Sequence, residues 1–319
     1  MFLCEFKDGK WNSPKIIPYD NFSISPASSV FHYGQAIFEG MKAYKDNDNN
    51  VWLFRPEENY NRLNKSCERM CMPKIEKDLF FNGIKELLTI DKEWIGKGDT
   101  TMYIRPVVFA TEATIVASPS KEFSFFILCS PASAYYFNPL SVLIEDTFIR
   151  AAKGGVGYAK AAGNYAGSFY PTSLAIEKGF DQIVWTDSVN HKLIEEAGTM
   201  NIFFRINNKL ITPEHTDTIL DGVTRKSVIT VAKDSGIDVE IRDIEVSEII
   251  QEYENGNLTE VFGAGTAAVI APISSFGYKE KKYILKDIDD AFGPIIKKKI
   301  TDIQNNLTED KYNWRYQVI

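Results

Sequence analysis

Short apolar segments of strand length, separated by turn residues and by longer amphipathic segments, most constrain the fold of this 319-residue chain. None approaches the ~20 residues that a helix needs to span a bilayer, so we expect no membrane-embedded part. We predict strands within 142–146, 181–187, 199–206, 209–213, 238–244 and 258–265, and helices over 167–178, 224–235 and 286–304. Asn207-Asn208 joins two of these strands with the composition of a tight hairpin turn.

The first 129 residues predict alternating strands and helices. We expect a hairpin of 41–45 and 51–55, a helix that begins at Pro56 and is ended by Pro73, a helix over 79–90, and strands over 100–110 and 122–129. Pro106 lies in the middle of one predicted strand, where its missing N–H indicates an edge position or a bulge.

Together these patterns predict a mixed α and β (α+β) fold in two domains, as the chain length also indicates. A smaller N-terminal α/β domain is expected over 1–129 and a larger, strand-rich C-terminal domain over 142–319. Two prolines and small polar residues predict an interdomain loop at 130–141.

Composition excludes several classes of protein. Lys and Arg number 36 and Asp and Glu 43, a net charge of −7, which disfavours a nucleic-acid partner because such binding needs a basic face. Residues 1–11 are interrupted by four charged side chains and form no secretory apolar region, so we expect a cytoplasmic protein. The four cysteines and three histidines lack zinc-site spacing, so no metal is expected. We interpret Cys67 and Cys71 as small buried side chains on one helix.

Lys160 is the only charged residue between Gly154 and Ile176, a segment rich in glycine and alanine. A solvated segment would carry more charge, so this lysine can lie in close-packed surroundings, where desolvation lowers an amine pKa and suits Schiff-base chemistry. The alternative is an ordinary surface lysine in a flexible glycine loop.

Two carboxylates, Glu195 and Glu196, stand directly before Gly198 and a strongly apolar strand. We expect Glu195 to lie at a turn end in water. For Glu196 a turn end and an inward position are equally open, and a buried carboxylate there would require a cationic or protonated partner.

Two further segments can bind anions through backbone N–H groups. A helix that begins after Asp221 or Gly222 would present the amides of Val223 and Thr224 to a phosphate. Residues 263–268 imitate a dinucleotide fingerprint, but strand-like residues follow where that fingerprint needs a helix, so an anion-binding turn with the Thr266 hydroxyl is favoured.

Two arginines are ambiguous from sequence alone. Arg62 borders the apolar stripe of the first helix, where most arginines are solvated. Arg105 shares a strand face with Tyr103, so it can either bind a carboxylate through two N–H groups or form a surface ion pair.

Six separated motifs give the chain a strong resemblance to the branched-chain amino-acid aminotransferases of pyridoxal phosphate fold type IV. The motifs occur in the family's order over nearly the whole chain: FHYGQAIFEG, RPEENYNRL, MYIRPV, GGVGYAKAAGNYA, EEAGTMNIF with DGVTR, and GAGTAA. The occurrence of all six motifs together in one chain is not expected by chance.

The resemblance implies a role for each candidate residue. Lys160 resembles the lysine that binds pyridoxal 5′-phosphate covalently, Tyr165 the group that binds the cofactor's phenolic oxygen, and Glu196 the carboxylate that keeps the pyridine nitrogen protonated. The phosphate would be held by Arg62, Val223, Thr224 and Thr266. The substrate side would be shaped by Tyr33, Phe38, Tyr103 and Arg105, and the Thr266–Ala267 turn would receive the α-carboxylate.

The implied reaction is transfer of the amino group of L-leucine, L-isoleucine or L-valine to 2-oxoglutarate, in two halves. Lys160, once displaced by the incoming amino acid, would remove the proton from its Cα. One pocket must therefore accept both an aliphatic side chain, which suits Phe38 and Tyr103, and that of glutamate, which suits Arg105 or a tyrosine hydroxyl.

The resemblance also implies a homodimer. Some relatives carry a redox CxxC after the GT pair, where this chain has Ala268 and Ala271, so we expect no thiol regulation there. Three alternatives remain: another fold-type-IV enzyme such as a D-amino-acid aminotransferase or an aminodeoxychorismate lyase, a nicotinamide-dependent dehydrogenase using residues 263–268, and a noncatalytic binding protein of the same fold.

Overall fold

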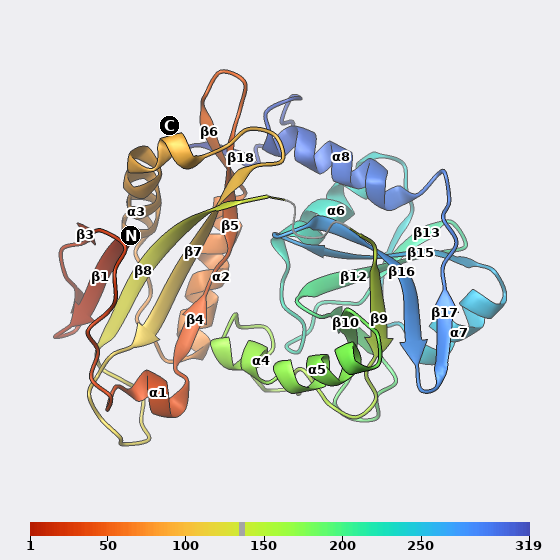
Figure 1. Cartoon of the computed structure of the whole chain (residues 1–319), viewed down its shortest axis with the longest axis horizontal. Helices are drawn as coiled ribbons and strands as arrows, with labels where there is room; N and C mark the ends of the chain where they lie inside the picture. Colours follow the sequence, from red (N-terminus) through yellow and green to blue (C-terminus); the bar gives the residue numbers. More distant parts are fainter. Residues whose placement is uncertain (134–137) are drawn as a thin grey trace. The chain divides into compact units, whose positions relative to one another are not determined.

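The computed structural model describes residues 1–133 and 138–319, which divide into two compact units (Figure 1). Among the described residues, unit 1 comprises 1–133, 159–163 and 303–319, and unit 2 comprises 138–158 and 164–302. Both units contain strands and helices, which confirms the predicted two-domain α+β class. No helix in the described part of the chain is long and apolar enough to cross a membrane.

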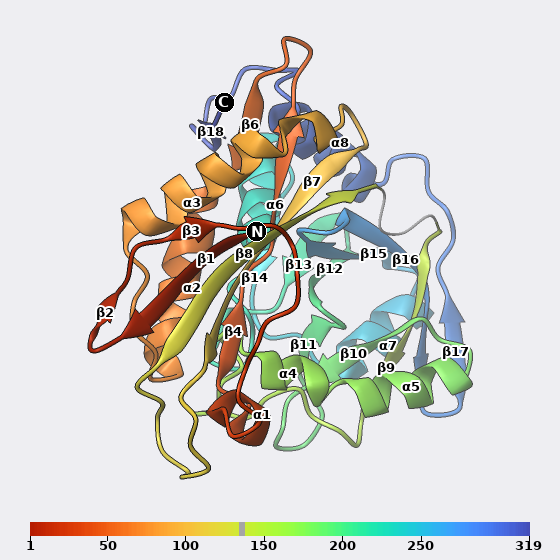
Figure 2. The same ribbon diagram turned by 60° about the vertical axis from the view of Figure 1, so that its left-hand side comes forward.

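Unit 1 is built on a nine-stranded sheet with the order β18-β6-β5-β7-β8-β1-β2, to which β3 adds on β1 and β4 on β7. Its strands are β1 (Phe2–Lys7), β2 (Lys10–Trp11), β3 (Lys15–Ile16), β4 (Ala36–Phe38), β5 (Met41–Lys45), β6 (Val51–Phe54), β7 (Thr101–Ala110), β8 (Phe123–Ala132) and β18 (Arg315–Gln317). Its helices are α1 (Ser29–Tyr33), α2 (Pro56–Arg69), α3 (Lys77–Ile90) and the 3-10 turn η1 (Lys92–Trp94). The long strands β7 and β8 lie side by side in Figure 2.

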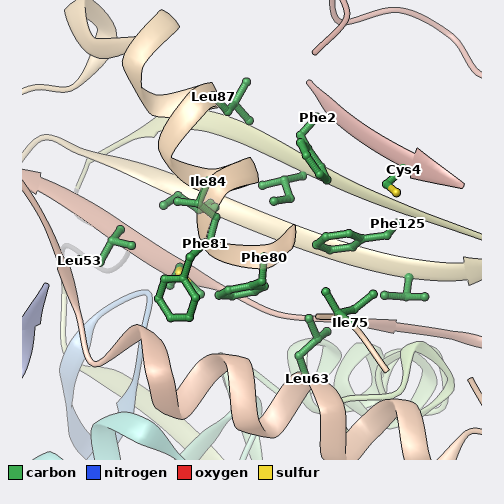
Figure 3. Packing of buried hydrophobic residues seen from close by; sticks show 14 of the residues in the cluster. Phe2, Cys4, Leu53, Leu63, Ile75, Phe80, Phe81, Ile84, Leu87 and Phe125 are labelled. Atoms are coloured by element: carbon green, nitrogen blue, oxygen red, sulfur yellow. The ribbon is translucent and has the colours of Figure 1, made fainter. Parts of the chain in front are cut away.

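The core of unit 1 forms where α2 and α3 pack their apolar stripes on the sheet (Figure 3). Leu63 of α2 and Phe80 of α3 are fully buried and lie close to Phe125 of β8. Helical residues three and four apart share a face, so each helix presents one continuous apolar stripe to the strands. This packing holds α2 in place, and α2 carries one of the candidate site residues.

Pro106 lies in the interior of the sheet, so the predicted edge position or bulge is wrong. On one side β7 pairs with β8 along its whole length, and on the other with β5 and then with β4. The Pro106 carbonyl accepts a hydrogen bond from the Glu39 N–H at the break between β4 and β5. The missing N–H therefore faces a gap in the pairing, where it costs no ladder bond.

Unit 2 contains a sheet with the order β11-β10-β9-β16-β15-β12-β13-β14, and β17 adds on β16. Because β11 also pairs with β12, the strands from β11 to β12 close into a ring. The strands are β9 (Leu140–Ile144), β10 (Gln182–Thr186), β11 (Ile194–Ala197), β12 (Met200–Ile206), β13 (Lys209–Thr212), β14 (Val239–Ile241), β15 (Leu258–Gly265), β16 (Val269–Tyr278) and β17 (Lys281–Ile284). The remaining helices are α4 (Ala162–Ala166), α5 (Phe169–Glu177), α6 (Val223–Asp234), α7 (Val246–Glu254) and α8 (Phe292–Gln304).

Most predicted elements occur in the structure, but several observed elements were not predicted. Those without a prediction are strands β1–β4, β11, β17 and β18 and helices α1, α4 and α7. Helix α8 begins at Phe292, several residues after the predicted start at 286. Cys67 is buried as expected, whereas Cys71 is exposed because α2 ends at Arg69 and the chain turns there with a φ of 54° at Cys71.

The division into 1–129, 130–141 and 142–319 differs from the compact units. Part of the predicted loop completes β8 and part begins β9, while residues 134–137 lie outside the described part of the chain. Residues 159–163 and 303–319 were assigned to the C-terminal domain but group with unit 1. They do so because Ala161 pairs with Ile37 and because β18 pairs with β6, long-range contacts that local patterns do not report.

Candidate active site

Lys160 is anchored by its backbone between β4 and α2 of unit 1. Its N–H donates to the Ser66 hydroxyl at 2.9 Å, and its carbonyl accepts the Phe38 N–H at 3.1 Å. The ammonium nitrogen lies 4.9 Å from the centre of the Phe38 ring, a cation–π distance. The Lys160 side chain is only partly buried. The close-packed surroundings predicted from composition therefore describe its bonded backbone better than its amine.

Arg62 is buried and paired with a carboxylate that sequence analysis did not identify, Glu39. Two parallel bonds join them, Nε to Oε1 at 2.7 Å and Nη2 to Oε2 at 3.0 Å, and the Asn59 amide adds a bond of 2.8 Å. Burial opposes ionisation of Glu39, but the charges of Arg62 and Lys160 and the bonds from Arg62 and Asn59 hold its pKa below the usual range. Most helical arginines are solvated, but Arg62 is buried, and the pairing with Glu39 makes burial of the guanidinium possible.

Three predicted substrate-side residues lie together beside Lys160. The Arg105 guanidinium carbon lies 4.6 Å from the ring centre of Phe38 and 5.2 Å from that of Tyr103, and Arg105 Nη2 donates to the Tyr103 hydroxyl at 2.8 Å. Gly40 allows this arrangement, because a Cβ there would overlap the Tyr103 hydroxyl. Arg105 Nε is buried and has no hydrogen-bond partner among the described residues.

Tyr33, the fourth predicted substrate-side residue, points elsewhere. It is the last residue of α1, is 44% exposed, and donates its hydroxyl to the Ile115 carbonyl on the loop after β7.

Glu195 and Glu196 lie on β11 in unit 2, and both are buried. Glu196 forms an ion pair with Arg150 at 2.9 Å and accepts the Leu220 N–H, so it has the cationic partner that an inward carboxylate requires. The solvent-exposed position expected for Glu195 is wrong: only 7% of it is exposed, because β11 is an interior strand rather than a turn end. Burial raises the pKa of Glu195 to about 7, a bond from the Thr218 hydroxyl opposes the rise, and the charge of Glu196 adds to it.

Tyr165 lines a small pocket of unit 2 together with Arg150 and Glu196. It belongs to α4, the short helix that follows the glycine-rich segment. The predicted phenol-binding and pyridine-binding residues are therefore brought together within this unit.

Helix α6 begins at Val223 as predicted, with Gly222 at its N-cap. Gly222 has no side chain to cap the helix, and a Cβ there would overlap the Asn201 amide oxygen. The amides of Val223 and Thr224 thus stand at the positive end of a 12-residue helix, a favourable position for an anion.

Residues 266–268 form the turn between β15 and β16, which pair as antiparallel neighbours. A strand follows this turn instead of a helix, so the geometry does not match a dinucleotide fingerprint. Val269 has a φ of 62°, a conformation that a β-branched residue rarely adopts, and such strain concentrates at functional sites. Thr266 and Ala267 lie in a backbone turn suited to an anion.

Comparison with known proteins identifies the family. The model of the amino-transferase class IV family matches residues 36–276. A probable branched-chain-amino-acid aminotransferase of Staphylococcus aureus (strain N315) is 45% identical, over 98% of this chain and 88% of its own. The chain belongs to the class IV aminotransferases. Its identity to that relative groups this aminotransferase with the branched-chain enzymes.

Solved structures agree with the fold of this aminotransferase. The branched-chain amino acid aminotransferase of Escherichia coli superposes with a TM-score of 0.82 at 24% identity and 99% coverage of both chains. A second such enzyme, from T.th., complexed with N-(5′-phosphopyridoxyl)-L-glutamate, superposes with a TM-score of 0.79 at 22% identity, over 99% of this chain and 98% of its own. The predicted fold type IV is confirmed.

Two charged residues of this aminotransferase were missed in the sequence, Glu39 and Arg150. Glu39 stands between an aromatic residue and Gly40-Met41 in an otherwise apolar segment, a local signal of burial that could have identified it. Arg150 had no such signal, because its contacts with Glu196 and Thr218 arise only in the folded unit.

Proposed function

We propose that this aminotransferase transfers the amino group of L-leucine, L-isoleucine or L-valine to 2-oxoglutarate with pyridoxal 5′-phosphate as cofactor. The observation that carries the proposal is the placement of Lys160, anchored by two backbone bonds beside an aromatic ring and a buried Glu39–Arg62 pair. A chain of this family with a lysine so held has the amine that transamination requires.

Each unit, taken by itself, offers groups that suit such a cofactor. In unit 2 the Glu196 carboxylate suits a protonated pyridine nitrogen, Tyr165 the phenolic oxygen, and the α6 N-terminus with Val223 and Thr224 a phosphate. In unit 1 Arg62 is a buried cation of the kind that binds phosphate. In unit 2 the Thr266 hydroxyl, on the turn after β15, is also proposed as a phosphate ligand. The relative solved with a phosphopyridoxyl-glutamate supports the assignment.

When bound, pyridoxal phosphate supplies an aldehyde carbon that takes the amino group and a ring that withdraws electrons from the substrate Cα. Lys160 would hold the cofactor through its amine and, once that amine is free, would carry the proton that leaves the substrate Cα. Glu196, held by Arg150, would keep a proton on the ring nitrogen by accepting its hydrogen bond.

The substrate side must accept both a branched aliphatic side chain and the carboxylate of glutamate. Phe38 and Tyr103 provide apolar ring surface, and Arg105 provides a guanidinium whose buried Nε has no partner among the described residues. We propose that Arg105 binds the distal carboxylate of glutamate and 2-oxoglutarate, and that the Thr266–Ala267 turn binds the α-carboxylate. Tyr33 remains a proposed substrate-side residue. Its hydroxyl would have to leave the Ile115 carbonyl before it could contact a substrate.

We also propose a homodimer, on the resemblance to this family, and a cytoplasmic location. Size-exclusion chromatography with light scattering tests the first proposal; a monomeric active enzyme would contradict it.

Borohydride reduction followed by peptide mapping tests the assignment of the lysine. We expect the pyridoxyl group on Lys160, and recovery on another lysine would refute it. Assays with 2-oxoglutarate and either L-leucine or D-alanine then separate the branched-chain enzyme from a D-amino-acid aminotransferase, since D-alanine turnover without leucine turnover would favour the latter.

A further inference from the structure

Two adjacent carboxyl groups are buried on β11, and one guanidinium lies against them. Glu195 is 7% exposed and Glu196 is 2% exposed, while the Arg150 side chain is 6% exposed. Two neighbouring buried carboxylates ionise together only at a cost when a cation bonds just one of them, because desolvation and mutual repulsion both favour the neutral form. The hydrogen bonds around the two carboxyl groups indicate which of them is paired with the guanidinium.

Arg150 directs its donors to Glu196 and to two backbone carbonyls. Nε bonds Glu196 Oε2 at 2.9 Å, Nη1 donates to the Thr218 carbonyl at 2.6 Å, and Nη2 donates to the Gly157 carbonyl at 3.2 Å. Gly157 must be glycine for this, since a Cβ there would lie 2.7 Å from the Thr218 backbone. Three hydrogen-bond partners therefore fix the Arg150 guanidinium, and its positive charge compensates the carboxylate of Glu196.

Glu195 receives no direct bond from Arg150, although the charge of Arg150 favours its ionisation. Its Oε1 accepts the Thr218 hydroxyl at 2.6 Å, and its buried Oε2 has no hydrogen-bond partner among the described residues. Asp187, on the loop after β10, adds a second negative charge near Glu195. These surroundings stabilise the protonated carboxyl.

One further cation faces Glu196 from α6. Arg225 interacts with Glu196 electrostatically, but it is also influenced by Asp221 and Glu214, and its guanidinium donates to the Pro213 carbonyl at 2.7 Å. Arg150, by contrast, bonds Glu196 directly.

We propose that Arg150 is a positioning residue that keeps Glu196 ionised and correctly oriented, while the neighbouring Glu195 holds a proton. The inference rests on the proposed function, in which Glu196 accepts the hydrogen bond of the pyridine nitrogen. Without Arg150, the buried Glu196 would take up a proton at neutral pH and could no longer accept that bond.

The test compares the holoenzymes of wild type, Arg150→Met, Arg150→Lys and the control Arg242→Met. Arg242 is an arginine of the same unit that is 38% exposed and pairs with Glu248. For each, kcat and KM for L-leucine with 2-oxoglutarate are measured between about pH 6 and 9, together with the dissociation constant of pyridoxal phosphate.

For Arg150→Met we expect kcat at about pH 6 to fall by roughly tenfold or more, with recovery as the pH rises and Glu196 ionises. KM for L-leucine should change by less than about threefold, and the dissociation constant of pyridoxal phosphate should rise about tenfold. Arg150→Lys, which keeps the charge, should restore most of kcat at neutral pH, and Arg242→Met should match wild type.

A loss in Arg150→Met that is equal at every pH, or no rescue by Arg150→Lys, would overturn the proposal in favour of a merely structural role. If Arg150→Met does not fold, Glu195→Gln and Glu196→Gln decide: the proposal requires a loss of about 10²-fold or more in kcat for Glu196→Gln and less than about threefold for Glu195→Gln, and equal losses refute it. A wild-type enzyme that lacks transamination would instead refute the proposed function.

Discussion

The buried pair of Glu39 and Arg62 offers the sharpest test of the energetics in unit 1. Substitution Glu39→Met removes the carboxylate that bonds the Arg62 guanidinium twice, in a place where Glu39 is 0% and Arg62 8% exposed. Removing one partner of a buried ion pair leaves an uncompensated charge and costs about 3–5 kcal/mol. We therefore expect the free energy of unfolding to fall by that amount.

The assay is equilibrium urea unfolding at about pH 7 without added cofactor, with the double variant Glu39→Met/Arg62→Met beside the single one. The double variant should be more stable than Glu39→Met, because replacing both charges with apolar groups removes the uncompensated cation. Glu68→Met is the control: Glu68 also belongs to this unit, but its pair with Lys74 is 72% and 66% exposed, so the change should cost less than about 1 kcal/mol.

The pH dependence gives an independent check on the same pair. The pKa of Glu39 is lowered in the fold, so its contribution is present above its unfolded value of about 4.5 and is lost as the pH falls through the folded value. The difference between wild type and Glu39→Met should shrink in acid. A cost equal to that of Glu68→Met, or a double variant less stable than Glu39→Met, would refute the reasoning.

Three further outcomes are expected. Lys160→Ala should keep the fold by circular dichroism and lose transamination; turnover above background would leave the proposed mechanism without its base. Glu195→Gln should remove a pH dependence of the free energy of unfolding. Because the pKa of Glu195 is raised to about 7, the free energy of unfolding of wild type should fall by roughly 3 kcal/mol relative to this variant as the pH rises from about 4.5 to 7.5. Parallel stability curves of the two proteins would contradict the burial argument. Arg105→Met should lower kcat/KM for 2-oxoglutarate by about 10²-fold and for L-leucine by much less, and equal losses would remove Arg105 from carboxylate recognition.

Local patterns in the chain determined most of the elements. The hairpin at Asn207-Asn208 has φ angles of 49° and 64°, as a turn of this composition requires, and α2 and α6 begin at Pro56 and Val223 where the residue types predicted. Resemblance then assigned the family from six separated motifs, which the family match and a relative at 45% identity confirm. These properties depend on residues close together in the chain, so they can be recognised without the fold.

Tertiary structure decided which charged groups meet. Arg62 by itself has the sequence context of a solvated helical arginine. Only the fold, in which the end of β4 lies beside α2, places Glu39 against it. Glu195 has the context of a turn end, and only the pairing of β11 with both β10 and β12 buries it beside Glu196. Burial and charge pairing depend on atoms far apart in the chain, and desolvation makes their energies large only after those atoms have been brought together.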